Sequence, residues 1–170
     1  MPTGGGKSIC FQVPAMMKEG ICLVITPLIA LMRDQVDNLE RRGIKAVAIY
    51  AGLTNREVEQ VLENARRGRY KFLYVSPERL QTRRFLDYCD GMPVNLLAVD
   101  EAHCISQWGY DFRPSYLQIA TIRQHFPGVP VLALTATATP AVQEDICAQL
   151  LMQQPKVFTK SFARANLSYS

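Results

Sequence analysis

Residues 94–103 read VNLLAVDEAH, and this stretch decides the fold class. Its first six residues are almost continuously apolar, which is typical of a strand covered by helices on both faces. Short runs of the same character recur along the chain, separated by longer amphipathic segments. These runs are ICLVIT (21–26), AVAIY (46–50), FLYV (72–75), VPVLAL (129–134) and, more weakly, KVFT (156–159). The alternation predicts an α/β fold, in which a mostly parallel sheet has helices on both faces.

The segments between these runs carry the end signals of helices. Residues 28–42 have apolar side chains at helical spacing, and a glycine follows them. Thr54 and Glu57 fit the T-x-x-E pattern of a capping box, which predicts that a helix starts there. The pair Thr139-Pro140 predicts the start of another helix, ending near residue 152. In such folds, functional side chains gather at the carboxyl ends of the strands.

The composition is that of an ordinary globular domain. The chain has 170 residues, of which 48% are apolar and 20% charged, and this excludes a disordered protein or a coiled coil. No apolar run approaches the roughly 20 residues that cross a bilayer, and no signal peptide is recognisable. The net charge of +4 permits a polyanionic partner without requiring one. Five cysteines, an odd number without a C-x-x-C pair, predict neither a disulfide framework nor a zinc cage and favour a reducing, intracellular compartment.

The first eight residues, MPTGGGKS, match the phosphate-binding pattern G-x-x-x-x-G-K-[ST] except at Met1. Glycines let backbone N–H groups turn around a phosphate without interference from Cβ atoms. Lys7 would reach the β- and γ-phosphates, and the hydroxyl of Ser8 would ligate Mg²⁺. The alternative is a flexible glycine-rich tail. The residues expected to hold nucleotide are Thr3, Gly4, Gly5, Gly6, Lys7 and Ser8.

The pair Asp100-Glu101 follows the apolar run of residues 94–99. In a phosphate-loop enzyme, Asp100 would hold Mg²⁺, and Glu101 would orient and deprotonate the attacking water. A charged turn after a strand is the simpler alternative. The position of the pair, about 90 residues after G-K-S and within a strand–helix series, favours a nucleoside triphosphatase.

These motifs resemble those of the RecQ family, within the superfamily-two helicases of the DEAH type. The resemblance covers nearly the whole chain and includes Met1 of the phosphate loop. It implies a three-layer, RecA-like phosphate-loop fold that lacks the strand before the loop, and an ATP-dependent 3′→5′ DNA helicase of recombination and repair. The stretches that carry it are MPTGGGKS (1–8), TPLIALMRDQV (26–36), VSPERL (75–80), AVDEAHCISQWGYDFRPSY (98–116), ALTATAT (133–139) and SFARANLSY (161–169).

The resemblance also implies roles for single residues. Lys7, Asp100 and Glu101 would act in catalysis, with ATP and Mg²⁺ as cofactors. His103 would join them and couple hydrolysis to DNA. The aromatic stretch that ends at Tyr116 would sense DNA, because bases stack on aromatic rings; a small satellite core is the alternative. The residues expected in DNA binding or coupling are Thr26, Arg33, Arg79, Gln107, Trp108, Phe112, Arg113, Thr135 and Thr137.

Some of these positions allow another interpretation. For Arg33 and Arg79, a solvated helix face competes with a phosphate contact. For the A-T-A-T run that contains Thr135 and Thr137, packing of small residues at a strand end is the alternative to coupling, above all for its alanines. The family usually has histidine where this chain has Tyr110, so the role of that position is open, although tyrosine can still stack.

By the same resemblance, residues 1–170 form part of the first RecA-like lobe, cut at both ends. The adenine-recognising segment, the second lobe, the zinc-binding and winged-helix regions and a C-terminal module would be absent. We therefore expect this polypeptide to hydrolyse ATP poorly and not to unwind DNA. The expected partners are DNA, as single strands and duplex junctions, ATP and, through absent regions, a single-stranded-DNA-binding protein. No zinc is expected in residues 1–170. The expected compartment is the bacterial cytoplasm with its nucleoid, or the nucleus in a eukaryote.

Two other functions fit the residues. The chain could belong to another superfamily-two ATPase, such as an RNA helicase or translocase, although the W-G-x-D-F-R block argues against it. It could also be a non-catalytic nucleic-acid-binding or regulatory fragment. ATP affinity, and its dependence on Lys7, distinguishes an ATPase lobe from such a module.

Overall fold

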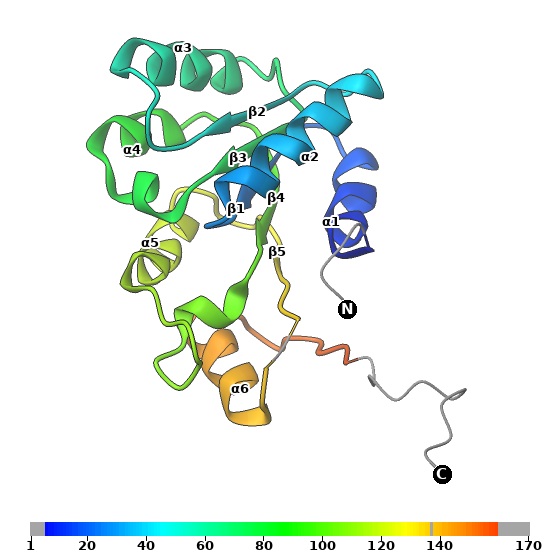
Figure 1. The fold of residues 1–170 in the computed structure, drawn as a ribbon, viewed down its shortest axis with the longest axis vertical. Coiled ribbons are helices and arrows are strands. Elements are labelled where there is room, and N and C mark those ends of the chain that lie inside the picture. The colour runs from blue at the N-terminus through cyan, green and yellow to red at the C-terminus, as the bar shows by residue number, and fades with distance from the viewer. Residues whose placement is uncertain (1–5, 137, 160–170) are drawn as a thin grey trace.

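The computed structural model describes residues 6–136 and 138–159, and a sheet of five parallel strands lies at their centre (Figure 1). The strands are β1 (Ile21–Ile25), β2 (Ala46–Ile49), β3 (Phe72–Val75), β4 (Val94–Val99) and β5 (Val131–Ala133). Their order across the sheet is β2-β3-β1-β4-β5, and every neighbouring pair is parallel. Because parallel strands need crossover connections, the chain leaves each strand at one edge and returns over a face of the sheet.

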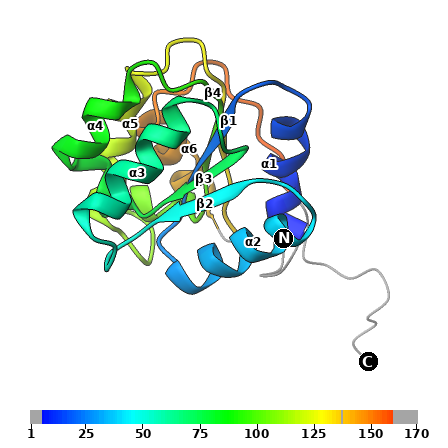
Figure 2. The same ribbon diagram turned by 90° about the horizontal axis from the view of Figure 1, so that it is seen from above.

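Helices cover both faces of the sheet, which gives the three layers expected (Figure 2). Helices α1 and α2 pack on one face and α3–α6 on the other. None of the described helices is long and apolar enough to cross a membrane. The α-helices are α1 (Gly6–Met16), α2 (Ile29–Arg41), α3 (Asn55–Arg66), α4 (Arg83–Cys89), α5 (Gln118–Arg123) and α6 (Pro140–Gln149), and the short 3-10 helices are η1 (Pro77–Gln81), η2 (Ala102–Ile105) and η3 (Pro114–Leu117).

Alternate side chains of a strand face opposite layers, and this explains why the strands are apolar throughout. On β1, Cys22 and Val24 pack with α1 and α2. Leu23 and Ile25 pack into the larger core beneath α3–α6. Every residue of β1 and of β3 is buried, as expected for strands covered on both sides.

The strong strand predictions and the predicted helix starts are confirmed. In the capping box, the N–H of Glu57 donates to the hydroxyl of Thr54 at 3.2 Å, and the N–H of Thr54 donates to the Glu57 carboxylate at 2.7 Å. The hydroxyl of Thr139 accepts from the N–H of Val142 at 3.3 Å, and α6 begins at Pro140. Local side-chain chemistry therefore sets the beginnings of α3 and α6.

The weak strand prediction at 156–159 is wrong. These residues are exposed and pair with no strand in the described part of the chain. A lone strand leaves its N–H and C=O groups to water, and four residues bury too little to offset the loss of chain entropy. Helices α4 and α5 were not predicted, because seven and six residues are too few for a helical period to stand out.

Candidate functional site

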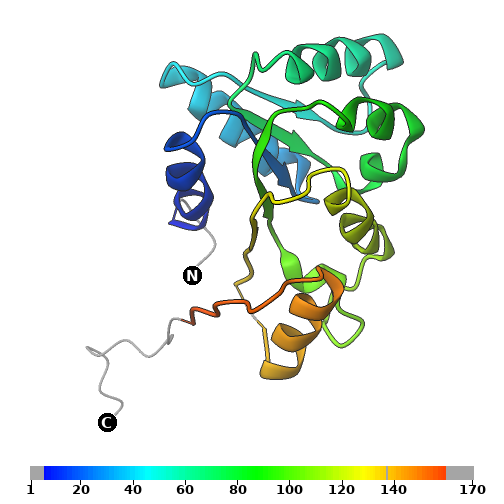
Figure 3. The ribbon, with the colours of Figure 1, turned by 180° about the vertical axis from the view of Figure 1, so that it is seen from behind.

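Buried polar side chains gather where the parallel strands end. Among the residues that the structure describes, the buried polar ones are Thr26, Ser76, His103 and Ser106. Thr26 follows β1, Ser76 follows β3, and the other two follow β4. Because the carboxyl ends of parallel strands meet at one edge, these residues share a single edge of the sheet. Figure 3 shows the loops that leave this edge, with the turn after β4 beside α6.

Lys7, in the first turn of α1, reaches the two carboxylates that follow β4. Its Nζ lies 3.2 Å from Oε1 of Glu101 and 3.4 Å from Oδ1 of Asp100. The side chains of Lys7, Asp100 and Glu101 are only 11%, 13% and 17% exposed. One largely buried ammonium group therefore faces two largely buried carboxylates, separated from it by more than 90 residues of sequence.

The electrostatics of this cluster favour a bound cation. Burial raises the pKa of Asp100 above its ordinary value, the Lys7 ammonium opposes that shift, and the charge of Glu101 adds to it. Two carboxylates that share one ammonium group keep a surplus of negative charge. The oxygens of Asp100 and of the half-buried Ser8 hydroxyl are the hard donors that Mg²⁺ prefers. The donor chemistry of these residues therefore suits a magnesium ion.

The turn that carries the acidic pair is held from three sides. The N–H of Asp100 donates to the carbonyl of Ile25 at 2.9 Å, and the N–H two residues later donates to the carbonyl of Leu134 at 2.9 Å. The buried hydroxyl of Tyr116 donates to the Asp100 carbonyl at 2.8 Å. Together these bonds hold Glu101 in a left-handed conformation, with φ of 51°. That conformation costs a non-glycine residue on the order of 1 kcal/mol and is typical of functional turns.

His103 lies on η2 and links the acidic pair to the chain that follows β5. Its Nδ1 is 2.8 Å from Oγ1 of Thr135 and 3.6 Å from Oε2 of Glu101. Burial lowers the pKa of the imidazole, while the Glu101 carboxylate opposes that shift. His103 therefore bridges the turns that follow two neighbouring strands.

Tyr110 stacks on His103. The two ring centroids are 4.8 Å apart, and the ring planes differ by 17°. The approach depends on Gly109, because a Cβ at that position would lie 3.0 Å from the carbonyl oxygen of His103. Tyr110 is nevertheless 77% exposed, so most of its ring stays accessible while it contacts the acidic turn.

Residues 106–113, between η2 and η3, present large rings to solvent and are termed the aromatic loop. Trp108 is 79% exposed, and its neighbour Gln107 is exposed too. A surface of this kind can stack on nucleic-acid bases. Tyr116 differs from these rings, because it is fully buried beyond the loop and contacts the Asp100 carbonyl instead.

Arg113 is bonded at the base of the aromatic loop, and both it and its neighbour Phe112 are half-buried. The N–H of Arg113 donates to the carbonyl of Cys104 at 2.8 Å. The guanidinium of Arg113 lies 3.4 Å from a carboxylate oxygen of Asp111. A phosphate at Arg113 would therefore have to compete with this internal ion pair.

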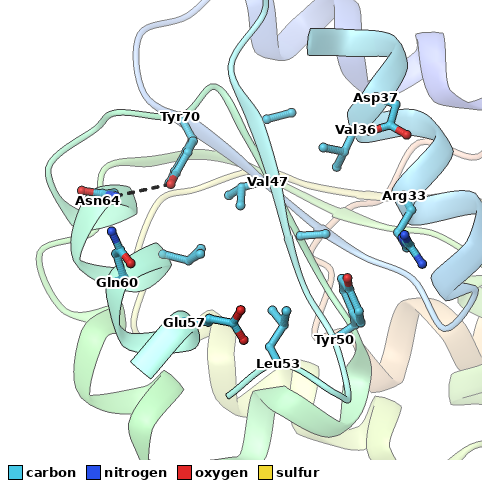
Figure 4. Close-up of a pocket in the computed structure, with 13 residues that line it drawn as sticks. Arg33, Val36, Asp37, Val47, Tyr50, Leu53, Glu57, Gln60, Asn64 and Tyr70 are labelled. Carbon is cyan, nitrogen blue, oxygen red and sulfur yellow. Dashed lines mark hydrogen bonds between the residues drawn. The ribbon is translucent and has the colours of Figure 1, made fainter. Parts of the chain in front are cut away.

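The other predicted DNA contacts lie outside the acidic cluster. Thr26 is buried directly after β1, and its hydroxyl accepts from the N–H of Leu28 at 3.5 Å. Arg33 is exposed on α2 and lines a groove of about 420 Å³ over the edge strand β2 (Figure 4). Arg79 donates to the carbonyl of Tyr50, another residue of this groove, at 3.0 Å. The two arginines are thus placed near the β2 side of the sheet.

Several predicted residues lie outside the described residues, namely Thr3, Gly4, Gly5 and Thr137, and so does the stretch 161–169. Gly6 is the first residue of α1. Sequence reasoning missed Gly109 and the hydroxyl of Tyr116. Both are within a quoted motif, but no spacing rule says which glycine must leave room for His103 or which hydroxyl will reach the Asp100 carbonyl.

Comparisons with known proteins relate this chain to helicases. Residues 1–146 match the model of the DEAD/DEAH box helicase family. The ATP-dependent DNA helicases RecQ of Bacillus subtilis and Pasteurella multocida are 51% and 48% identical to the chain over 170 residues. These alignments cover 99% and 100% of this chain, but the chain spans only 29% and 27% of those relatives. The helicase domain of Hef from Pyrococcus furiosus has a TM-score of 0.64 at 21% identity, covering 88% of this chain and 31% of that chain.

Removal of the Tyr116 hydroxyl should destabilise the fold. We expect Tyr116→Phe to lower the free energy of unfolding by about 1 kcal/mol, because the Asp100 carbonyl loses a buried donor. Urea denaturation followed by circular dichroism measures the change. Tyr88→Phe, at a half-buried tyrosine on α4, is the matched control and should change stability little. Equal stability of Tyr116→Phe and the wild type would contradict the anchoring contact.

The raised pKa of Asp100 has a consequence for stability. The folded chain binds this proton more tightly than the unfolded chain, so stability falls as pH rises through the interval between the two pKa values. Asp100→Asn keeps the acceptor for the Glu101 N–H, which is 2.9 Å away, but cannot ionise. We therefore expect this variant to be more stable than the wild type at neutral pH.

Thermal unfolding across the acidic and neutral range measures this difference. Asp87→Asn, at an exposed position of α4, is the control and should follow the wild type at every pH. A lower melting temperature for Asp100→Asn than for the wild type at neutral pH would show that the ion pair with Lys7 outweighs the burial of the carboxylate.

Proposed function

Because this chain belongs to the DEAD/DEAH box helicase family, we propose that it is the ATP-binding lobe of an ATP-dependent 3′→5′ DNA helicase. The observation that carries the proposal is the contact of Lys7 with both Asp100 and Glu101 at the end of β4. The 51% identity to a RecQ DNA helicase supports DNA as the polymer. The chain spans 29% of that relative, so unwinding, and the assignment of residues 1–170 to the first of two RecA-like lobes, are also part of the proposal.

Nucleotide binding would reuse the contacts of Lys7. The ammonium group would exchange its two carboxylate partners for the β- and γ-phosphates of ATP. Backbone N–H groups at the start of α1 would add donors, since a helix N-terminus favours bound phosphate. Asp100 and Ser8 would hold Mg²⁺, which neutralises phosphate charge when it is bound. The surplus negative charge of the acidic pair supports binding of this cation, which would take the place of the ammonium group beside the carboxylates.

Glu101 would act as the base in hydrolysis once Lys7 has moved to the phosphates. The carboxylate would orient the attacking water and take its proton. Oε2 of Glu101 lies 3.6 Å from Nδ1 of His103, so a change of charge on Glu101 would act directly on the imidazole. His103 would pass the change to Thr135, 2.8 Å away, and to Tyr110, which stacks on its ring. These contacts support a route from the nucleotide to the aromatic loop.

DNA would bind the exposed rings of the aromatic loop. Trp108 and Tyr110 offer accessible faces to unpaired bases, and base–aromatic stacking tolerates any sequence. Arg33 and Arg79, near β2, would contact phosphates elsewhere along the bound DNA. A compartment that contains DNA, such as the bacterial cytoplasm, follows from this proposal.

Nucleotide binding is tested with a fluorescent ATP analogue and Mg²⁺. We expect Lys7→Ala to weaken binding at least about tenfold, because a charge-assisted contact is lost and two carboxylates are left facing the phosphates. Lys18→Ala, at an exposed lysine, is the matched control and should bind as the wild type. Glu101→Gln should bind nucleotide but hydrolyse it more slowly than the wild type. Equal affinity of Lys7→Ala and the wild type would reduce the chain to a non-catalytic module.

DNA binding is tested through Trp108, the single tryptophan of the chain. Single-stranded DNA should quench its emission saturably, and Trp108→Ala should weaken binding of labelled DNA about tenfold, since stacking on one ring contributes about 1–3 kcal/mol. Phe158→Ala removes an aromatic ring that is 90% exposed outside the loop and serves as control. Equal affinities of the two variants would contradict a role for the loop. Tighter binding of single-stranded RNA than of DNA would instead favour an RNA helicase.

A further inference from the structure

Three side chains with metal-binding atoms converge at the base of the aromatic loop: His103, Cys104 and Asp111. A ring nitrogen, the sulfur and a carboxylate oxygen all lie within 4.8 Å of one another. His103 and Cys104 are buried, and Asp111 is half-buried. His103 and Cys104 are neighbours on η2, and Asp111 lies in the loop that follows. This spacing matches no common metal-binding pattern such as C-x-x-C, so the sequence alone does not reveal the set.

We infer that this cluster binds a thiophilic divalent cation of the Zn²⁺ type. Thiolate, imidazole and carboxylate are the ligand classes that zinc uses, and three protein ligands leave a fourth position for water. In a tetrahedral site with ordinary zinc–ligand distances, neighbouring ligand atoms are about 3.5 Å apart. The ligand atoms here are up to 4.8 Å apart, so they would have to approach one another by about 1 Å to bind the cation.

Asp111 is the ligand placed to make this movement. Cys104 is fixed in η2, and its thiol already donates to Oδ2 of Asp111 across 3.9 Å. Asp111 lies in the aromatic loop and pairs with Arg113, whose side chain is 37% exposed. A cation would replace the guanidinium as the positive partner of Asp111, and Arg113 would turn toward water.

When the cation binds, it replaces the proton on the sulfur of Cys104. Burial raises the pKa of Cys104 to about 12, and the charge of Asp111 adds to the shift, so the group is a thiol before the cation arrives. On binding, the S–H bond breaks, the proton leaves to solvent, and a sulfur electron pair forms the bond to the metal. No group changes its oxidation state.

A bound cation would tie the aromatic loop to η2. Trp108 and Tyr110 lie between the ligands of the two elements in sequence, so their motion would be restricted. His103 would keep one ring nitrogen on the metal while its ring still lies beside Glu101 and Thr135. An effect on coupling to DNA rests on the proposed function, whereas binding of the cation needs neither nucleotide nor DNA.

Competition with a chromophoric zinc chelator measures affinity and stoichiometry, and Trp108 emission reports the loop. We expect one equivalent of Zn²⁺ to bind and to change the emission saturably. Cys104→Ser and Asp111→Asn should each weaken binding at least about tenfold, since even partners outside the ligand shell contribute that much. Cys10→Ser, at an exposed cysteine, should bind as the wild type.

Circular dichroism checks whether each variant is folded. If Cys104→Ser unfolds, Asp111→Asn, at a half-buried loop position, still tests the inference. Failure of the wild type to compete with the chelator would overturn the inference. So would equal Zn²⁺ affinity of Asp111→Asn and the wild type. Loss of binding in Cys10→Ser would assign the cation to the surface thiol and would also overturn it.

Discussion

Hydrogen bonds that continue two strand ladders beyond the end of β4 are the constraint on which the site depends. The N–H of Asp100 pairs with the end of β1, and the N–H two residues later pairs with Leu134 after β5. Both ladders are parallel and buried, so a slip of β4 would move its whole set of apolar side chains to the wrong layers. The acidic pair therefore has a fixed position relative to its neighbours. The left-handed backbone of Glu101 is maintained because these hydrogen bonds and that of the Tyr116 hydroxyl fix the residues on either side of it.

The charges of the site are only partly compensated within the chain itself. Burial disfavours the charged form of Asp100, and one ammonium group, that of Lys7, serves both carboxylates. Lys7 comes from α1 on one face of the sheet, whereas the carboxylates follow the internal strand β4. Under the proposed function, a triphosphate with its cation would satisfy all of these groups at once. His103 extends the cluster toward the aromatic loop, so the same few contacts connect the two surfaces that the proposed function uses.

Much of the fold could be predicted because its signals are local. Residues 94–99 are almost continuously apolar, as expected for a strand covered on both faces. Thr54 and Glu57, three residues apart, cap a helix through their own side chains. The run at 156–159 failed because a strand exists only when another strand accepts its backbone groups, and composition cannot report that. The same limit applies to Tyr116. The sequence does not separate it from the other rings of its motif, whereas packing places it in the core.

The sequence by itself determined the layers, the caps of α3 and α6, and the kinds of residue that meet at the strand ends, because hydrophobic period and motif spacing are written along the chain. Only the tertiary structure decided which groups touch. It brought Lys7 to both carboxylates, stacked Tyr110 on His103, and set Cys104 beside Asp111. Such contacts depend on strand order and on the path of loops, and these are fixed by the summed packing of the whole chain rather than by any local stretch.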